Sequence, residues 1–349
     1  MIQIILTALV LLAGAAPLPT PAPSMLVIAH RGASGERPEH TRAAYDLAID
    51  QGADFIEPDL VLSRDGVLIV RHENEIGGTT DVADHPEFAD RHTTRTVDGA
   101  PVTGWFTEDF TLAELQTLRA RERLPALRPA NTAWTDEPIL TFQQVIDIAR
   151  AGSARTGRVI GVVPELKHPS HFAAAGLPME DVFVAILTAN DLTAADAPIL
   201  IQCFEVGPLQ RLATRIDAPM LQLMSVHGGP ADRPDLTYAA MATPAGLAAI
   251  SAYARWIGVE AAMIAPDLDR PQTALIPDAH AAGLRVSAWT FRAEPVFLPP
   301  GAADLTTWLT AFRDFGLDAA FSDFPAAAAA VARRGVRDQD APTPSSPGG

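Results

Sequence analysis

The feature that most constrains the fold is an alternation of short apolar runs with helix-like stretches. The runs that read as strands are 26–30, 54–63, 159–166, 198–204, 220–225, 263–267, 284–291 and 318–323. The stretches that read as helices are 41–51, 141–151, 178–190, 205–214, 244–255, 271–282, 303–315 and 325–334. Eight strands alternating with eight helices predict a parallel sheet closed into an α/β (β/α)8 TIM barrel. An open doubly wound sheet is the alternative, but no G-x-G-x-x-G opens the first helix.

No linker or change of composition divides residues 25–334, so the sequence predicts one catalytic domain. Residues 73–138 are too long for a simple loop after the second strand, and we interpret them as an insertion over one face of the barrel. Within the insertion, Thr111 and Glu114 have the spacing of a capping box and predict a helix. A shorter insertion, 226–242, follows the fifth strand.

The two ends of the chain differ from this pattern. Residues 1–24 combine an apolar run, small residues and a Pro-rich stretch, which is typical of a signal peptide followed by a spacer. We therefore expect an exported protein, periplasmic or secreted. An uncleaved membrane anchor is the alternative, because no Lys or Arg precedes the apolar run. The Ala- and Pro-rich residues 335–349 are expected to be a disordered tail.

Charge and cysteine content exclude several kinds of site. The formal net charge is −16 and the pI about 4.9, which argues against a nucleic-acid partner. An acidic protein that binds an anionic substrate needs local positive charge, from a metal ion or from a few placed Arg and Lys side chains. The single cysteine, Cys203, excludes an internal disulfide and a thiolate metal cage.

Three acids fall at the ends of predicted strands, on the face where barrels of this kind carry their sites. Glu57 and Asp59 are two residues apart on a strand, so both side chains point to one face. With Glu165 they would form a three-carboxylate oxygen site, which suits a hard divalent cation such as Ca²⁺ or Mg²⁺. The alternative is that these acids are solvated, or paired with Arg31 and Lys167.

Two histidines at strand ends, His30 and His72, are the candidate proton carriers. Imidazole titrates near neutral pH, so one ring can accept a proton while the other donates one. Arg31 can donate two hydrogen bonds to phosphate oxygens, and Lys167 can serve as a point charge. Taken singly, each histidine would more often be structural. Together with the acids they suit the cleavage of a phosphodiester.

Three further residues at strand ends are candidate substrate contacts: Gln202, Phe204 and Trp289. Trp289 offers a ring face for an apolar or glycerol part of a substrate, and packing is the alternative.

At these residues the sequence resembles the glycerophosphodiester phosphodiesterase family, in its exported bacterial branch. The matching stretches are AHRGASGERPEHT, GADFIEPDLVLSRDGVLIVRHE, PELKHP, IQCFE and GLDAAFSDFP, spread over nearly the whole chain after residue 24. The resemblance implies a (β/α)8 barrel with His30 and His72 as general acid and base. It implies Glu57, Asp59 and Glu165 as ligands of one divalent cation, Ca²⁺ ahead of Mg²⁺, and Arg31 and Lys167 as phosphate-binding residues.

The expected reaction is hydrolysis of a small-molecule glycerophosphodiester to sn-glycerol 3-phosphate and an alcohol. One alternative is a phospholipase-type enzyme that acts on intact or lyso lipids. Another is a binding protein without catalysis, which would not need both His30 and His72. The sequence predicts no stable membrane insertion of residues 25–349, and it leaves a homodimer and the choice of alcohol open.

Overall fold

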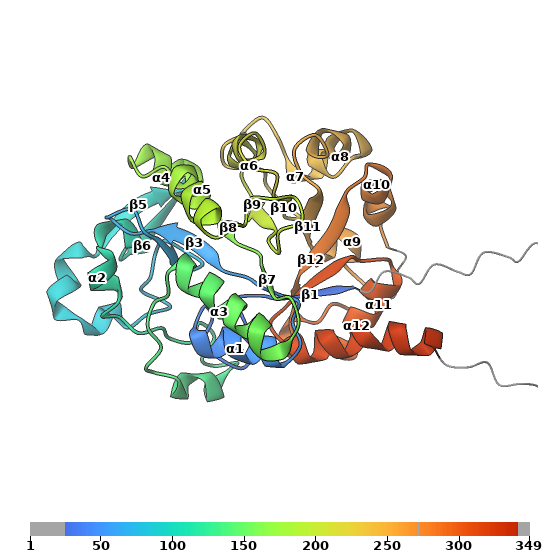
Figure 1. Cartoon of the computed structure of the whole chain (residues 1–349), viewed down its shortest axis with the longest axis horizontal. Helices are drawn as coiled ribbons and strands as arrows, with labels where there is room; N and C mark the ends of the chain where they lie inside the picture. Colours follow the sequence, from blue (N-terminus) through green and yellow to red (C-terminus); the bar gives the residue numbers. More distant parts are fainter. Residues whose placement is uncertain (1–24, 271, 341–349) are drawn as a thin grey trace, which may run out of the picture.

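A computed structural model describes residues 25–270 and 272–340 of the chain. Its centre is one curled, mainly parallel sheet (Figure 1), in the order β4-β3-β8-β9-β10-β11-β12-β13-β1-β2-β7. The strands are β1 Leu26–Ala29, β2 Phe55–Ile56, β3 Asp59–Leu62, β4 Leu68–Val70, β7 Gly161–Val162, β8 Glu165–Leu166, β9 Ile201–Cys203, β10 Met220–Met224, β11 Trp256–Glu260, β12 Arg285–Phe291 and β13 Ala319–Ser322. All neighbours in this sheet pair in parallel except β3 and β4. The α/β class predicted from the sequence is confirmed.

The predicted (β/α)8 barrel is confirmed in part: the sheet is curled, but its named strands run from β4 to β7 in the hydrogen-bonded order and do not form a regular closed ring of eight. An isolated parallel bridge, between Val162 of β7 and Ile199, links β7 to the residues before β9. The predicted strand 54–63 is split into β2 and β3 around Pro58, and the predicted strand 159–166 into β7 and β8 around Pro164. Proline has no amide hydrogen to give to a strand ladder, so each strand breaks there and the sheet curls irregularly.

The sixth strand also lies elsewhere than predicted. Residues 263–267 are the end of a helical turn and a loop, whereas the strand is β11, Trp256–Glu260. The preceding helix ends at Ile250 and not near residue 255. A five-residue apolar run carries no periodicity that separates strand from helix, and this one contains a glycine, which weakens the strand signal further.

Helices lie around the outside of the sheet (Figure 1). They are α1 Arg42–Asp50, α3 Phe142–Thr156, α4 Pro169–Ala174, α5 Met179–Ala189, α6 Val206–Ala213, α7 Tyr238–Met241, α8 Pro244–Ile250, α9 Ala261–Ile264, α10 Leu275–Ala281, α11 Leu305–Asp314 and α12 Pro325–Asp340. Thr41 caps α1 by accepting from the Ala44 amide, which satisfies one of the free N–H groups of the first turn. Helix α12 continues past the expected domain end at residue 334. The predicted signal peptide and residues 341–349 of the tail lie outside the described residues.

The insertion 73–138 has its own secondary structure. It contains the hairpin of β5 Thr93–Val97 and β6 Ala100–Gly104 and the short helix α2 Leu112–Leu115, with 3-10 turns at Val82–Asp84, Pro86–Arg91, Thr107–Asp109 and Pro129–Ala133. The capping box of Thr111 and Glu114 is confirmed. Figure 1 shows the hairpin beside α4, and His168, which precedes α4, has Nδ1 2.6 Å from Oδ2 of Asp98 at the hairpin turn. A second contact joins α4 to the 3-10 turn Thr107–Asp109, where His171 Nε2 lies 2.8 Å from Glu108 Oε1.

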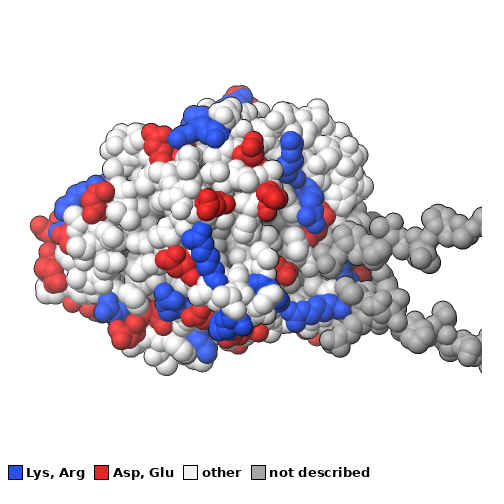
Figure 2. Space-filling view, in the orientation of Figure 1, with Lys and Arg blue, Asp and Glu red and all other residues white. Residues whose placement is uncertain are grey.

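Between residues 25 and 340, residue 271 aside, no helix is both long enough and apolar enough to cross a bilayer. Figure 2 shows acidic and basic side chains interspersed over the visible face, without a large patch of one sign.

Candidate active site

The carboxyl ends of the strands surround a cavity of about 590 Å³. Nine of the ten site residues predicted from the sequence line it: His30, Arg31, Glu57, His72, Glu165, Lys167, Gln202, Phe204 and Trp289. The tenth, Asp59, is not among the lining residues and has 1% of its surface exposed. The structure therefore brings together residues that are far apart in the sequence, as expected for a site at this edge of a parallel sheet.

Three buried carboxylates form the floor of the site. Glu57, Asp59 and Glu165 each offer an oxygen within 4.8 Å of the others. The break at Pro58 places Glu57 and Asp59 on either side of it, and the β3–β8 register sets Asp59 opposite Glu165. Among the described residues, Asp59 Oδ1 has no hydrogen-bond partner. Closely spaced buried carboxylates of this kind form an oxygen-rich site that suits a hard divalent cation.

The pKa values of these acids diverge. Burial raises the pKa of Glu165 to about 8, and the charge of Asp59 adds to the rise while Lys167 opposes it. Burial also raises the pKa of Glu57 well above its usual value, and Asp59 and Glu165 add to that rise. Burial alone would raise the pKa of Asp59 too, but Lys167 and His40 outweigh it and hold that pKa well below the usual range. The protein by itself therefore stabilises one negative charge here more readily than three.

His30 follows β1 and is held by an acid from the other end of the chain. Its Nδ1 lies 2.6 Å from Asp323 Oδ1, which follows β13. Arg128 and Arg292 in turn donate to Asp323, at 2.5 and 3.0 Å. A carboxylate at Nδ1 favours the tautomer with its proton there and leaves Nε2, which lies 3.9 Å from Glu57 Oε2, unprotonated. Burial, helped by Arg31, lowers the pKa of His30 to about 4, so the free ring is neutral at pH 7.

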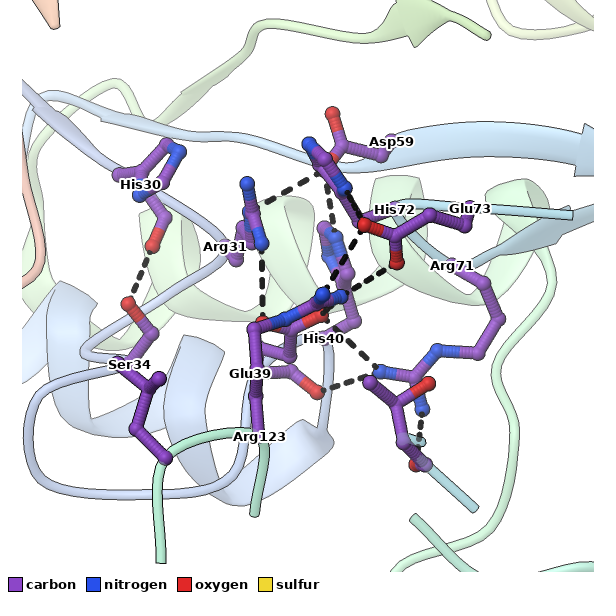
Figure 3. Close-up of polar contacts among 12 residues, drawn as sticks. His30, Arg31, Ser34, Glu39, His40, Asp59, Arg71, His72, Glu73 and Arg123 are labelled. Carbon is purple, nitrogen blue, oxygen red and sulfur yellow. Dashed lines mark hydrogen bonds and ion pairs between the residues drawn. The ribbon is translucent and has the colours of Figure 1, made fainter. Parts of the chain in front are cut away.

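His72 has the same arrangement on the opposite side of Arg31 (Figure 3). Its Nδ1 contacts the carboxylate of Glu73, and Arg123 of the insertion donates to both oxygens of Glu73 at 3.0 and 2.6 Å. Burial, together with the charges of Arg31 and Lys167, lowers the pKa of His72 to about 3. Both candidate proton carriers thus have one nitrogen fixed by a carboxylate and one nitrogen available.

The cationic residues are linked through shared acids. Arg31 donates from its amide to Glu57 Oε2 at 3.0 Å and from Nη1 to Glu39 Oε2 at 3.0 Å. Glu39 also accepts two hydrogen bonds from Arg123, both at 2.7 Å. Lys167 Nζ lies 2.8 Å from Glu165 Oε1. These contacts fix the cations beside the carboxylate cluster, where an anionic group would meet them.

The HRG turn explains how Arg31 enters the site. Arg31 and Gly32 have φ values of 61° and 86°, so the backbone reverses directly after β1. A Cβ on Gly32 would lie 2.7 Å from the carbonyl carbon of Ala44, inside any allowed contact. Glycine is therefore required by both the left-handed conformation and the close approach of α1.

Sequence reasoning missed several residues that position this site. His40 is buried, and its two ring nitrogens have different partners: Nε2 lies 2.8 Å from Asp59 Oδ2, and Nδ1 lies 2.8 Å from the Tyr45 hydroxyl. The Tyr45 hydroxyl in turn donates to the Glu57 carbonyl at 3.0 Å. His40 therefore orients a carboxylate of the cluster from behind. Its position in the PEHT stretch next to Thr41 was the only available signal. Glu39, Glu73, Arg123 and Asp323 were likewise not predicted as site residues.

The three predicted substrate contacts differ in environment. Gln202 is fully buried and donates from Nε2 to Glu57 Oε1 at 2.7 Å, so it holds an acid of the cluster. Phe204 and Trp289 form one wall of the cavity, with ring centroids 5.8 Å apart in a T-shaped contact. The Trp289 indole donates to the Gly258 carbonyl at 3.2 Å, which fixes its plane.

Comparisons with known proteins agree with this geometry. The chain is 37% identical over 328 residues to glycerophosphodiester phosphodiesterase GDPD6 of Arabidopsis thaliana, covering 88% of this chain and 85% of that protein. It is 30% identical over 215 residues to a glycerophosphodiester phosphodiesterase of Haemophilus influenzae, covering 57% of each. Plant and bacterial relatives both occur, so they indicate the family and not a branch of it.

Solved structures match the fold. An Oleispira antarctica phosphodiesterase in complex with the product sn-glycerol-3-phosphate superposes with a TM-score of 0.59 at 22% identity, over 88% of this chain and 96% of that one. A glycerophosphodiester phosphodiesterase of Agrobacterium tumefaciens gives 0.57 at 20% identity, over 88% and 98%. The sequence profile of the glycerophosphoryl diester phosphodiesterase family matches residues 30–327. The chain is an enzyme of the glycerophosphodiester phosphodiesterase family.

Proposed function

We propose that this enzyme hydrolyses glycerophosphodiesters to sn-glycerol 3-phosphate and an alcohol, with a divalent cation on Glu57, Asp59 and Glu165 and with His30 and His72 as general acid and base. The observation that carries the proposal is the pairing of each histidine with its own carboxylate, Asp323 for His30 and Glu73 for His72, beside the three-acid cluster. A non-catalytic binding protein has no use for two such pairs.

The acid cluster fits a cation on its own chemistry. All three side chains are oxygen donors and buried, and Asp59 Oδ1 is without a hydrogen-bond partner among the described residues. The raised pKa values of Glu57 and Glu165 reflect a repulsion that a cation would relieve. When bound, a divalent cation supplies positive charge against the charge that grows on the phosphoryl oxygens in the transition state. We favour Ca²⁺ over Mg²⁺.

The residues of the chain hold the substrate as follows. Arg31 donates to the phosphate oxygens, and Lys167 adds a second positive charge. Their partners Glu39 and Glu165 keep both cations in place before substrate arrives. Because the site is pre-arranged, little reorganisation is needed when the phosphodiester binds.

The two histidines carry the protons. Nε2 of one ring accepts the proton of the attacking hydroxyl, and Nε2 of the other donates a proton to the leaving alkoxide oxygen. Burial lowers the pKa of His30 to about 4 and that of His72 to about 3, so in the free protein both rings favour the base form. An anionic phosphodiester in the cavity favours the imidazolium, and so supplies the protonated partner when substrate is bound.

The test is release of glycerol 3-phosphate from glycerophosphocholine by the purified protein after chelation, and again after addition of Ca²⁺ or Mg²⁺. Activity that disappears with chelator and returns with one cation supports the reaction and the metal site together. Turnover of lysophosphatidylcholine alone would replace the proposal by the phospholipase-type alternative. Tight binding of the diester without any product in a single-turnover assay would replace it by the binding protein.

We further propose that the protein belongs to the exported bacterial branch and works outside the cytoplasm. The support is the apolar and Pro-rich composition of residues 1–24. Expression of the full chain in a bacterium, followed by cell fractionation and N-terminal sequencing, tests it. Recovery of the intact, uncleaved chain in the cytoplasm would contradict export.

A further inference from the structure

One side of the cavity is lined by aromatic rings. Phe204 stands in the middle of three rings, with centroids 5.8 Å from Trp289 and 6.0 Å from Tyr238, both in T-shaped contacts. All three rings line the cavity. Rings that meet edge to face present their surfaces in different directions, which is the arrangement of a cage and not of a flat stack.

The third ring, that of Tyr238, comes from the insertion 226–242, to which the sequence assigned no role. Tyr238 is the first residue of α7, and Thr237 caps that helix by accepting from the Ala240 amide. The insertion thus places a buried tyrosine against Phe204, a residue that follows β9. We call Phe204, Tyr238 and Trp289 the aromatic wall.

Besides Glu73, which holds His72, two carboxylates outside the metal cluster line the same cavity. Asp98 stands at the turn of the β5–β6 hairpin, where Asp98 and Gly99 have φ values of 48° and 81°, as in a tight two-residue hairpin turn. Glu205 directly follows Phe204 and is buried, accepting from the Ser170 amide at 3.1 Å. Burial raises the pKa of Glu205, and a bound cation would favour its charged form.

The arginines and the lysine that line the cavity pair with acids other than Asp98 and Glu205, and Arg31 pairs with Glu39. Lys167 is paired with Glu165 at 2.8 Å, and Arg292 with Asp323 at 3.0 Å. His168 Nδ1 contacts Oδ2 of Asp98 at 2.6 Å, and Oδ1 of Asp98 makes no hydrogen bond with the described residues. Aromatic faces together with carboxylates attract an organic cation, whose weak hydration makes transfer to such a wall favourable.

We infer that the aromatic wall, with Asp98 and Glu205, binds a quaternary ammonium group, and that the enzyme therefore prefers glycerophosphodiesters whose alcohol is choline. This inference rests on the proposed function, and it extends it by naming the alcohol class and the residues that select it. The phosphate stays on Arg31 and Lys167 whichever alcohol is present, so selection acts through the head group.

The first test compares kcat/KM for glycerophosphocholine with kcat/KM for glycerophosphoglycerol, which carries a neutral alcohol. We expect the wild type to prefer the choline diester by about tenfold or more. Tyr238→Leu and Asp98→Asn should each reduce this ratio several-fold, whereas Tyr238→Phe keeps the ring and should keep the ratio. Asp98→Asn retains an oxygen for His168, so the hairpin contact persists. Asp90→Asn, the same change at an exposed position of the insertion, is the matched control.

The second test does not depend on turnover. Calorimetry measures binding of choline and of its uncharged isostere 3,3-dimethyl-1-butanol to the wild type and to Tyr238→Leu. Choline should bind the wild type more tightly than the isostere, and the variant should lose that difference. Equal binding of both, or a kcat/KM ratio that neither Tyr238→Leu nor Asp98→Asn changes, overturns the inference. If neither diester is hydrolysed but choline still binds more tightly than its isostere, the proposed function is refuted and the quaternary ammonium subsite is supported.

Discussion

Arg123 and Glu39 form a two-pronged ion pair in which Nε and Nη2 of the arginine each donate to a carboxylate oxygen at 2.7 Å. The same guanidinium binds Glu73, which holds His72, while Glu39 holds Arg31 (Figure 3). One residue of the insertion therefore couples the proposed phosphate-binding arginine to a proposed proton carrier. Arg123 contacts neither the carboxylate cluster nor the cavity, so it acts through its partners.

Replacing Arg123 by Lys should lower kcat by about tenfold or more while changing KM less, because an ammonium cannot bind two carboxylates in parallel. Steady-state kinetics and the pH profile of kcat measure the effect, since a loosened Glu73 would shift the ionisation of His72. Arg119→Lys, in the same insertion but paired with exposed Asp136, is the matched control. Unchanged kcat in Arg123→Lys would show that the pair only stabilises the fold.

Replacing His30 or His72 by Ala should lower kcat by about 100-fold or more, since each change removes a general acid or base. Cation binding, followed by calorimetry, should persist because the acid cluster remains intact. His227→Ala, at an exposed histidine, should keep full activity. Wild-type turnover in both site variants would remove the histidines from the mechanism.

Cation binding should stabilise the fold because it relieves the repulsion among three buried carboxylates. At a concentration of about 100 times the dissociation constant, the gain is about 2.7 kcal/mol, which raises Tm by several degrees. Glu165→Gln should lose most of this rise. Glu122→Gln alters a buried carboxylate outside the cluster, so this variant should keep the rise in Tm. Thermal unfolding with chelator, Ca²⁺ or Mg²⁺ distinguishes these outcomes, and an equal rise in both variants would place the cation elsewhere.

The pair of His171 and Glu108 should make the stability of the fold depend on pH. Its hydrogen bond to Glu108 raises the pKa of His171 above 6.5. Burial alone would raise the pKa of Glu108, but the bond from His171 outweighs it and lowers that pKa below 4.5. His171 contributes fully to the free energy of unfolding below its unfolded pKa, and this contribution is lost as the pH rises through its folded pKa. Glu108 contributes fully above its unfolded pKa, and its contribution is lost as the pH falls through its folded pKa.

The pair should therefore contribute most between pH 4.5 and 6.5, by about 1 kcal/mol after allowance for its partial exposure. Urea unfolding of the wild type and of His171→Asn should show a larger difference in the free energy of unfolding at pH 5.5 than at pH 9. A difference independent of pH would mean that His171 acts by packing alone.

Gly32→Ala should be more destabilising than Gly283→Ala. Both glycines have positive φ, 86° and 77°, so both variants bear the conformational cost of about 1 kcal/mol. Only at Gly32 would the new Cβ meet backbone atoms, those of Ala44, whereas the space around Gly283 is open. The difference between the two free energies of unfolding thus measures the clash. Similar values would show that the HRG turn can shift away from α1.

The sequence allowed prediction of the carboxylate cluster because local spacing encodes it. Glu57 and Asp59 stand two apart in one strand-like run, and Glu165 ends another, so parallel packing brings them together. The strand at Trp256–Glu260 was missed because a run this short carries no usable periodicity. The sequence shows prolines at positions 58 and 164, but whether they break a strand depends on how the neighbouring strands pair.

The partners of the histidines could not be predicted in the same way. Asp323 lies 293 positions from His30, and Arg123 lies 84 positions from Glu39. No local pattern marks such pairs, because the curled sheet and the path of the insertion create them. His40 illustrates the same limit. The sequence shows a histidine at this position, but only the folded structure shows that it lies between Asp59 and Tyr45 and orients the Asp59 carboxylate.

The contact between His30 and Asp323 has a consequence for the order in which the chain is made. The ribosome makes His30 among the first residues of the domain, yet the carboxylate that fixes its tautomer is produced near the end. A chain released early, or cleaved before residue 323, would still have both histidines and all three acids of the cluster. It would lack the carboxylate that orients the imidazole of His30. With His30 as the proposed proton carrier, such fragments would be inert toward phosphodiesters even if they bound a cation. On that proposal, hydrolysis begins only after β13 has paired with β1.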